Sequence, residues 1–213
     1  MSDYQTEQLE ALSLVRMHLK SLPPRERETL LASAGEYLEF RADVDRFLAT
    51  HFGRVCDQAC YRSRVSACCS REGIITFFAD VVINLLVSSE PEADELVRVL
   101  KREPAAFKCV YLGHAGCRWR VKPIVCQMFL CEPARARVFT QDPEAEAEWR
   151  RFEARRKTFT WPDRPVLFDQ IEAYFLSAGC ASRLMYLHNS PGLLRLKQRA
   201  GLASSPTGRP SGG

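Results

Sequence analysis

The chain has 213 residues, with 30 Lys and Arg against 26 Asp and Glu, a formal net charge of +4, and 46% hydrophobic residues. This is the composition of a water-soluble globular domain, and it excludes a collagen-like or low-complexity chain. The small charge gives no reason to expect a nucleic acid or an anionic membrane as partner. The unusual feature is the presence of nine cysteines.

The sequence favours a cytoplasmic location. The segment after Met1 is polar and contains acidic residues, so it lacks the basic start and apolar core of a secretory signal. The longest apolar stretch runs from Ile74 to Val87, shorter than the roughly 20 residues that span a bilayer. Disulfides are rare in the reducing cytoplasm, and an odd cysteine count also argues against a disulfide framework. Clustered cysteines therefore favour metal binding or redox chemistry.

The first part of the chain has a helical pattern. From Thr6 to about Phe52, apolar residues recur mostly at helical intervals, interrupted by Pro23 and Pro24. This pattern predicts two or three helices that pack around the later cysteine region.

Two stronger helix signals follow. The apolar ladder from Ile74 to Leu86 has the i, i+3, i+4, i+7 spacing of a buried helix and predicts the central core helix. The sequence Ser89-Glu90-Pro91-Glu92 is typical of a capping box, so we expect a second helix from there to about Pro104.

The segment from Cys109 to Val121 contains two short β-prone runs around a glycine-bearing turn, which predicts a small hairpin. Pro123 is expected to start a short helix that carries Cys126 and Cys131.

Later elements are polar helices and a tail. Interleaved acids and bases from Asp142 to Phe159 predict a solvated helix, with Glu146 and Arg150 at i, i+4 spacing. Further helices are expected over 165–175 and 193–199, and the Ser-, Pro- and Gly-rich stretch from residue 203 predicts a disordered tail. The arginines of the solvated helix alternate with acids and lack an aromatic stacking platform, so nucleic-acid binding is unlikely.

The expected fold class is mainly α with a small β-hairpin, a compact helical domain organised around a cysteine metal cluster. The expected organisation is an N-terminal helical segment (1–52), a metal-binding core (53–135), C-terminal helices (136–202) and the tail (203–213).

Eight of the nine cysteines form two groups along the chain, and we predict them as metal ligands: Cys56, Cys60, Cys68 and Cys69, then Cys109, Cys117, Cys126 and Cys131. Adjacent Cys68 and Cys69 should point in different directions in regular structure, so they could serve different ions. Eight sulfurs could fill two four-coordinate sites, one shared cluster, or one site with spare thiols.

Basic residues flank both groups and could compensate the charge of thiolates. The first group is flanked by Arg54, Arg62, Arg64 and Arg71 with Asp57 as the acid, and the second by Lys108, Arg118, Arg120 and Lys122 with no acid.

Other candidates are weaker. His114 lies between Cys109 and Cys117 but is more simply explained as a surface residue of the turn. Cys180 is expected to be structural. Asp80, with Asn84 at i+4, could be a ligand or an active-site carboxylate, but a helix-capping or solvent-facing role is commoner.

These motifs resemble the YkgJ-type cysteine-cluster family over about residues 56 to 131. The resemblance rests on Cys68-Cys69, Cys109 with Cys117, Lys122-Pro123, Cys126 and Phe129-x-Cys131. It implies chelation of zinc or iron, the latter including an iron–sulfur cluster.

The resemblance also supplies an alternative function, because flagellin lysine N-methylases are similar in carrying such a cluster. It implies an iron–sulfur-dependent enzyme. The C-x3-C-x2-C spacing of radical S-adenosylmethionine enzymes, Gly-rich phosphate loops and GxSxG are all absent, so no motif supports catalysis. A zinc-ribbon nucleic-acid module ranks last because the chain has no C-x2-C pair. A protein partner is left open.

Overall fold

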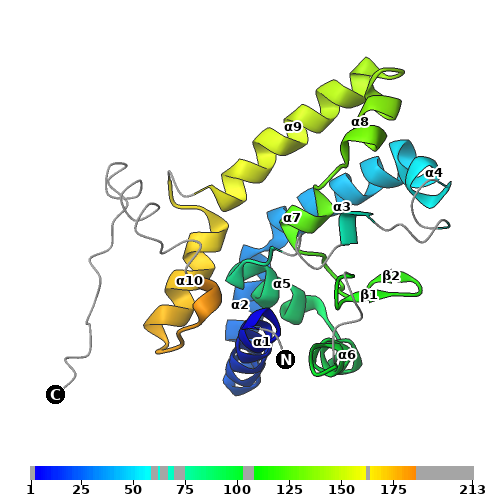
Figure 1. The fold of residues 1–213 in the computed structure, drawn as a ribbon. Coiled ribbons are helices and arrows are strands. Elements are labelled where there is room, and N and C mark those ends of the chain that lie inside the picture. The colour runs from blue at the N-terminus through cyan, green and yellow to red at the C-terminus, as the bar shows by residue number, and fades with distance from the viewer. Residues whose placement is uncertain are drawn as a thin grey trace.

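The computed structural model describes residues 3–58, 62, 67–69, 75–102, 108–161 and 164–185. The described chain is mainly helical with one two-stranded antiparallel sheet (Figure 1). The mainly α expectation with a small hairpin is therefore confirmed. No described helix has the length and apolar character needed to cross a membrane. The predicted helix over 193–199 and the predicted tail lie outside the described residues.

Three helices form the N-terminal part, as the sequence predicts: α1 (Asp3–Ser21), α2 (Pro24–Ser33) and α3 (Gly35–His51). Proline at the first position of α2 separates it from α1, because proline fits the first turn of a helix but not its interior. A short α4 (Gly53–Cys56) follows α3, and a 3-10 turn, η2 (Ala67–Cys69), carries the paired cysteines.

The central helix is α5 (Phe78–Val87), and every residue from its start to Leu86 is buried. Helices α1, α2 and α10 (Leu167–Ser177) all pack against it (Figure 1). The predicted central helix is confirmed, but it begins later than expected. Phe77 is extended, and its backbone N–H donates to Asp80 Oδ2 at 3.1 Å, which fixes the start of the helix.

The capping box is confirmed at α6 (Glu90–Leu100). The Ser89 backbone N–H and hydroxyl both donate to Glu92 Oε2, at 2.8 and 2.9 Å. Helix α1 lies against α6, where the side-chain amide of Gln5 donates to the carbonyl of Leu100 at 2.8 Å.

The predicted hairpin is present as β1 (Leu112–Gly113) and β2 (Gly116–Cys117). The short helix after Pro123 is α7 (Ile124–Gln127), and it carries Cys126 but not Cys131. Cys131 is instead the N-cap residue of a separate helix, α8 (Glu132–Phe139), in which Pro133 occupies the first turn. The prediction of one helix carrying both cysteines is therefore wrong, because the chain leaves helical geometry after Gln127.

Helix α9 (Pro143–Thr160) confirms the solvated helix, and Arg150 donates to Glu146 at 2.7 Å. Its buried face packs on α3 through aromatic rings, including Phe47 against Trp149 at 5.5 Å. A last turn, η3 (Arg183–Met185), packs against α1, and Arg183 pairs with Glu10 at 2.9 Å.

Candidate metal site

The structure describes seven of the eight predicted ligands, and Cys60 lies outside the described residues. None of the eight described cysteines, Cys180 included, forms a disulfide. Cys56 ends α4 and is exposed, and Cys131 is partly buried at the start of α8. The other five predicted ligands come together, and we call them the thiol group: Cys68, Cys69, Cys109, Cys117 and Cys126.

A backbone hydrogen bond joins the two sequence groups of cysteines. The N–H of Cys109 donates to the carbonyl of Cys69 at 2.8 Å. This backbone bond places Cys69 and Cys109 next to each other, so one thiol from each sequence group lies in the same region. It connects η2 to the segment that leads into β1.

The hairpin brings Cys109 close to Cys117. Leu112 pairs with Cys117 and Gly113 with Gly116, and the N–H of Arg118 donates to the carbonyl of Tyr111 at 3.0 Å. Gly116 has a φ of +105°, which favours glycine because side chains with a Cβ are strained there. The tight turn therefore depends on this residue.

Backbone amides near three of the sulfurs favour the thiolate form. Those of Tyr111 and Leu112 lower the pKa of Cys109, those of Trp119 and Arg118 lower the pKa of Cys117, and that of Ile75 lowers the pKa of Cys126. A backbone N–H dipole near a sulfur lowers the pKa of the thiol because it stabilises the thiolate. Donors of this kind orient thiolates and reduce their charge at metal sites.

Burial outweighs these donors in the absence of a cation. It raises the pKa of Cys109 to about 12 and that of Cys126 to about 11, and it also raises the pKa of Cys117. Cys117 and Cys126 each add to the shift of Cys109 through the repulsion of their thiolates. These three thiols therefore lie close enough together for a thiolate at one of them to disfavour ionisation of another.

Cys68 and Cys69 behave as a pair. A hydrogen bond between their side chains is the main cause of a raised pKa at Cys68 and a lowered pKa at Cys69. The two side chains thus interact, whereas the sequence led us to expect them to point in different directions. Cys109, Cys117 and Cys126 also act on Cys69.

Three of the described basic residues that flank the cysteines pair with acids, whereas the sequence led us to expect them to compensate thiolates. Arg118 forms an ion pair with Glu95, Arg120 lies 3.6 Å from Glu92, and Arg62 lies 2.7 Å from Asp57. Lys122 is the cation whose charge lowers the pKa of Cys117 and of Cys68. Acids of α6, distant in sequence, therefore take up much of the charge that the sequence assigns to the thiolates. Arg64 and Arg71 lie outside the described residues.

Three polar side chains fix the segment that leads to Cys126. Asp80 Oδ1 accepts the N–H of Ile124 at 3.1 Å, and Asn84 Oδ1 accepts the N–H of Val121 at 2.9 Å. Asp80 is therefore a capping residue for both α5 and α7, which agrees with the commoner of its predicted roles. Arg41 is the third, and no motif in the sequence indicates this role.

Arg41 is only 3% exposed and holds the same segment from α3. Its guanidinium donates to the Lys122 carbonyl, to the side-chain oxygen of Gln127, and to the Tyr37 hydroxyl at 2.6 Å. A buried arginine requires such partners, because an unpaired buried charge is costly. The sequence signal is weak: Arg41 occupies an otherwise apolar face of a predicted helix.

The remaining candidates lie elsewhere. His114 is exposed in the hairpin turn, as predicted. The sulfur of Cys180 lies 3.8 Å from His18 Nδ1, at the contact between α1 and the end of α10.

Among the described residues, no three His, Cys, Asp or Glu side chains are already arranged to hold an ion. The thiol group is therefore gathered by the backbone but is not a preformed coordination sphere. Comparisons of the chain with family models, with curated proteins and with solved structures each find no match. The resemblance to the YkgJ-type family stays a prediction from the cysteine motifs.

Proposed function

We propose that the protein binds zinc or iron through clustered thiolates. The observation that carries this proposal is the hydrogen bond from the Cys109 N–H to the Cys69 carbonyl, which joins two sequence-distant cysteine groups at one place. Thiolate sulfur is the ligand type that suits zinc and iron–sulfur clusters, and hard cations such as magnesium are disfavoured by it.

The number and type of ligand atoms suit a zinc or iron ion. Cys69, Cys109, Cys117 and Cys126 supply four thiols, the number that a tetrahedral zinc or iron site takes. A bound cation would offset the burial and mutual repulsion that raise the pKa of Cys109 and Cys126. The backbone amides that lower the pKa of Cys109 and Cys117 would then also stabilise the bound thiolates.

The ion would supply stability, or electron transfer if it is an iron–sulfur cluster. Backbone contacts already join the segments of Cys69, Cys109 and Cys117, which supports their use as ligands of one ion. Whether Cys56, Cys60, Cys68 and Cys131 complete a second site is a separate prediction of the sequence.

The decisive experiment is anaerobic purification followed by elemental analysis and a visible absorption spectrum. We expect at least one equivalent of zinc or iron per chain. A colourless zinc protein indicates a structural site, whereas a brown protein with visible charge-transfer bands indicates an iron–sulfur cluster and favours the enzyme alternative. Substoichiometric metal under all conditions, with every thiol freely titratable, would refute the proposal.

A further inference from the structure

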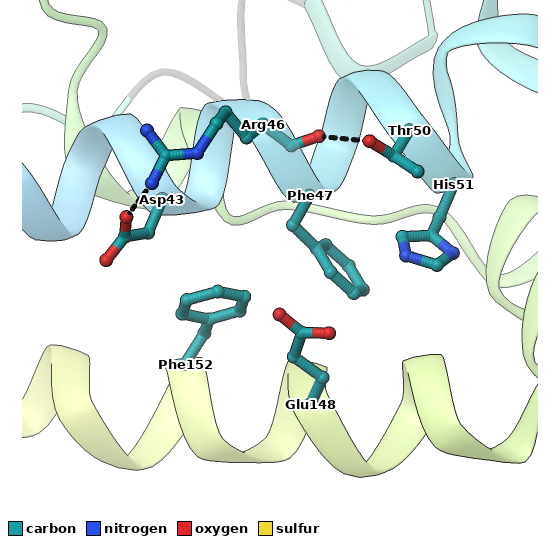
Figure 2. A pocket seen from close by; sticks show the side chains of 7 residues that line it. All are labelled: Asp43, Arg46, Phe47, Thr50, His51, Glu148 and Phe152. Carbon is teal, nitrogen blue, oxygen red and sulfur yellow. Dashed lines mark hydrogen bonds and ion pairs between the residues drawn. The ribbon is translucent and has the colours of Figure 1, made fainter.

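A second site lies between α3 and α9, formed by residues outside the thiol group. A cavity of about 390 Å³ opens there, and its walls include Asp43, Phe47, His51, Glu148 and Phe152. In Figure 2 the carboxylate of Glu148 points up from α9 toward the rings of α3, between Phe152 and His51.

The other charged groups of this cavity have partners. Asp43 is paired with Arg46 and lies 3.4 Å from Arg155, and His51 Nδ1 lies 3.4 Å from Asp142. Figure 2 shows the Arg46 guanidinium directed at Asp43 and away from Glu148. Among the described residues that line the cavity, one carboxylate therefore has no basic partner.

That carboxylate is Glu148. It is partly buried, and no residue in the described part of the chain forms an ion pair or a hydrogen bond with its side chain. A partly buried carboxylate that faces a cavity and lacks a cation partner offers a place for a cationic group. A cation that enters the cavity would gain an ion pair with it.

The walls beside Glu148 are aromatic. The rings of Phe47 and Phe152 meet edge to face at 5.5 Å, and Phe47 is held in place by Trp149 on α9 and by the His51 ring at 4.6 Å. Phenyl rings attract cations and also contact aliphatic chains, whereas they gain nothing from a hydrated inorganic ion. Phe47 is only 4% exposed and is packed on both sides, so Phe152, which is partly exposed, supplies most of the accessible aromatic surface.

We propose that this cavity binds an organic cation, an alkylammonium or alkylguanidinium group. Glu148 pairs with the charge, and Phe152, backed by the buried Phe47, contacts the aliphatic chain. An anion is disfavoured by Glu148, and a neutral apolar ligand would bury that carboxylate without a partner. The group could belong to a free amine or to a lysine or arginine side chain of another protein, since the recognised chemistry is the same.

The test is titration of the full-length protein with n-butylammonium, followed by NMR shifts of the backbone amides of Thr50 and Phe152. We expect saturable binding with a Kd on the order of 1 mM, which is typical of so small a ligand. Butylguanidinium should bind similarly, while 1-butanol and ammonium chloride should each bind at least about tenfold more weakly, because each lacks one of the two contacts. A peptide with a single lysine then distinguishes a side chain from a free amine as the source.

The variant Glu148→Gln should weaken butylammonium binding at least about tenfold, because it removes the charge and keeps the shape. The matched control is Glu144→Gln, an exposed acid in the first turn of the same helix, which should bind like the parent protein. Equal binding by Glu148→Gln, equal binding of 1-butanol, or no saturable shift would each overturn the proposal.

Discussion

The carboxylate of Asp80 accepts the backbone N–H of Ile124 at 3.1 Å, and its other oxygen accepts the N–H of Phe77 at the same distance. One buried side chain thus starts two helices, α5 and α7, that are far apart in the sequence. Since α7 carries Cys126, the core helix and the thiol group share a single anchor.

Replacing Asp80 by alanine should lower the free energy of unfolding by about 3 kcal/mol, because two buried N–H groups lose a charged acceptor. Asp80→Asn keeps one acceptor oxygen and should lose roughly half as much. Urea unfolding of the metal-free protein measures both. The control Glu144→Ala removes an exposed first-turn acid from α9 and should cost no more than about 1 kcal/mol. An equally small effect at Asp80 would contradict its double capping role.

Gly116→Ala should destabilise the hairpin by about 1–2 kcal/mol, because the φ of +105° is strained for alanine although no atom lies within 4 Å of the added Cβ. The same variant should bind less metal, since the turn brings Cys109 to Cys117. Gly35→Ala is the matched control: its Cβ also meets nothing within 4 Å, and its φ is not in the left-handed region. We expect it to be neutral or to stabilise by about 0.5 kcal/mol.

The proposed site predicts different outcomes for two cysteine-to-serine variants. Cys126→Ser should lower bound metal and the Tm, because structural zinc can contribute on the order of 10 kcal/mol to folding. Cys180→Ser should change neither, as its sulfur contacts His18 at the contact between α1 and the end of α10. Elemental analysis and thermal melts of both purified variants test this. Equal metal content in the two would overturn the assignment of Cys126 as a ligand.

The metal-free protein should lose stability at alkaline pH. Burial raises the pKa of Cys109 to about 12 and of Cys126 to about 11 from an ordinary value of 9.0. A raised pKa means that the stability contributed by the protonated thiol is complete below about pH 9 and is lost as the pH rises toward 11 and 12. The lowered pKa of Cys69 has the opposite effect on stability at alkaline pH. It is outweighed because several other cysteines have a raised pKa.

Urea midpoints measured from pH 7 to 10.5 should therefore fall above pH 9, with a shallower fall in Cys126→Ser. Metal affinity should rise over the same range, because each ligand must lose its proton before it binds. Stability that increases from pH 9 to 10.5 would be inconsistent with buried, protonated thiols.

Elements with a local signal could be predicted from the sequence. The ladder that ends at Leu86 and the capping box at Ser89 each define a helix through neighbours in the chain, and both helices are present. The start of α5 could not be predicted, because it depends on Asp80, which also holds a distant backbone. The helix α8 could not be predicted either, because its N-cap is Cys131 and its apolar residues do not gather on one face.

The candidate site divides in the same way. Clustering of cysteines indicated which residues to consider, but which of them meet depends on long-range pairing, such as that of Cys69 with Cys109. The flanking arginines show the limit most clearly. The sequence assigns Arg118 to the thiolates, whereas the structure pairs it with Glu95 of α6. The scaffold role of Arg41 likewise requires knowledge of three partners that no local pattern supplies.

Helix α1 contacts α5, α6 and η3, which brings Gln5 to Leu100 and Glu10 to Arg183. During synthesis this helix is complete long before η3 leaves the ribosome. The part of its surface that packs on η3 therefore stays exposed until residues 183–185 are made, and such exposure favours aggregation or chaperone capture. We thus expect α1 to pack on α5 and α6 first and to complete its packing only when η3 joins them.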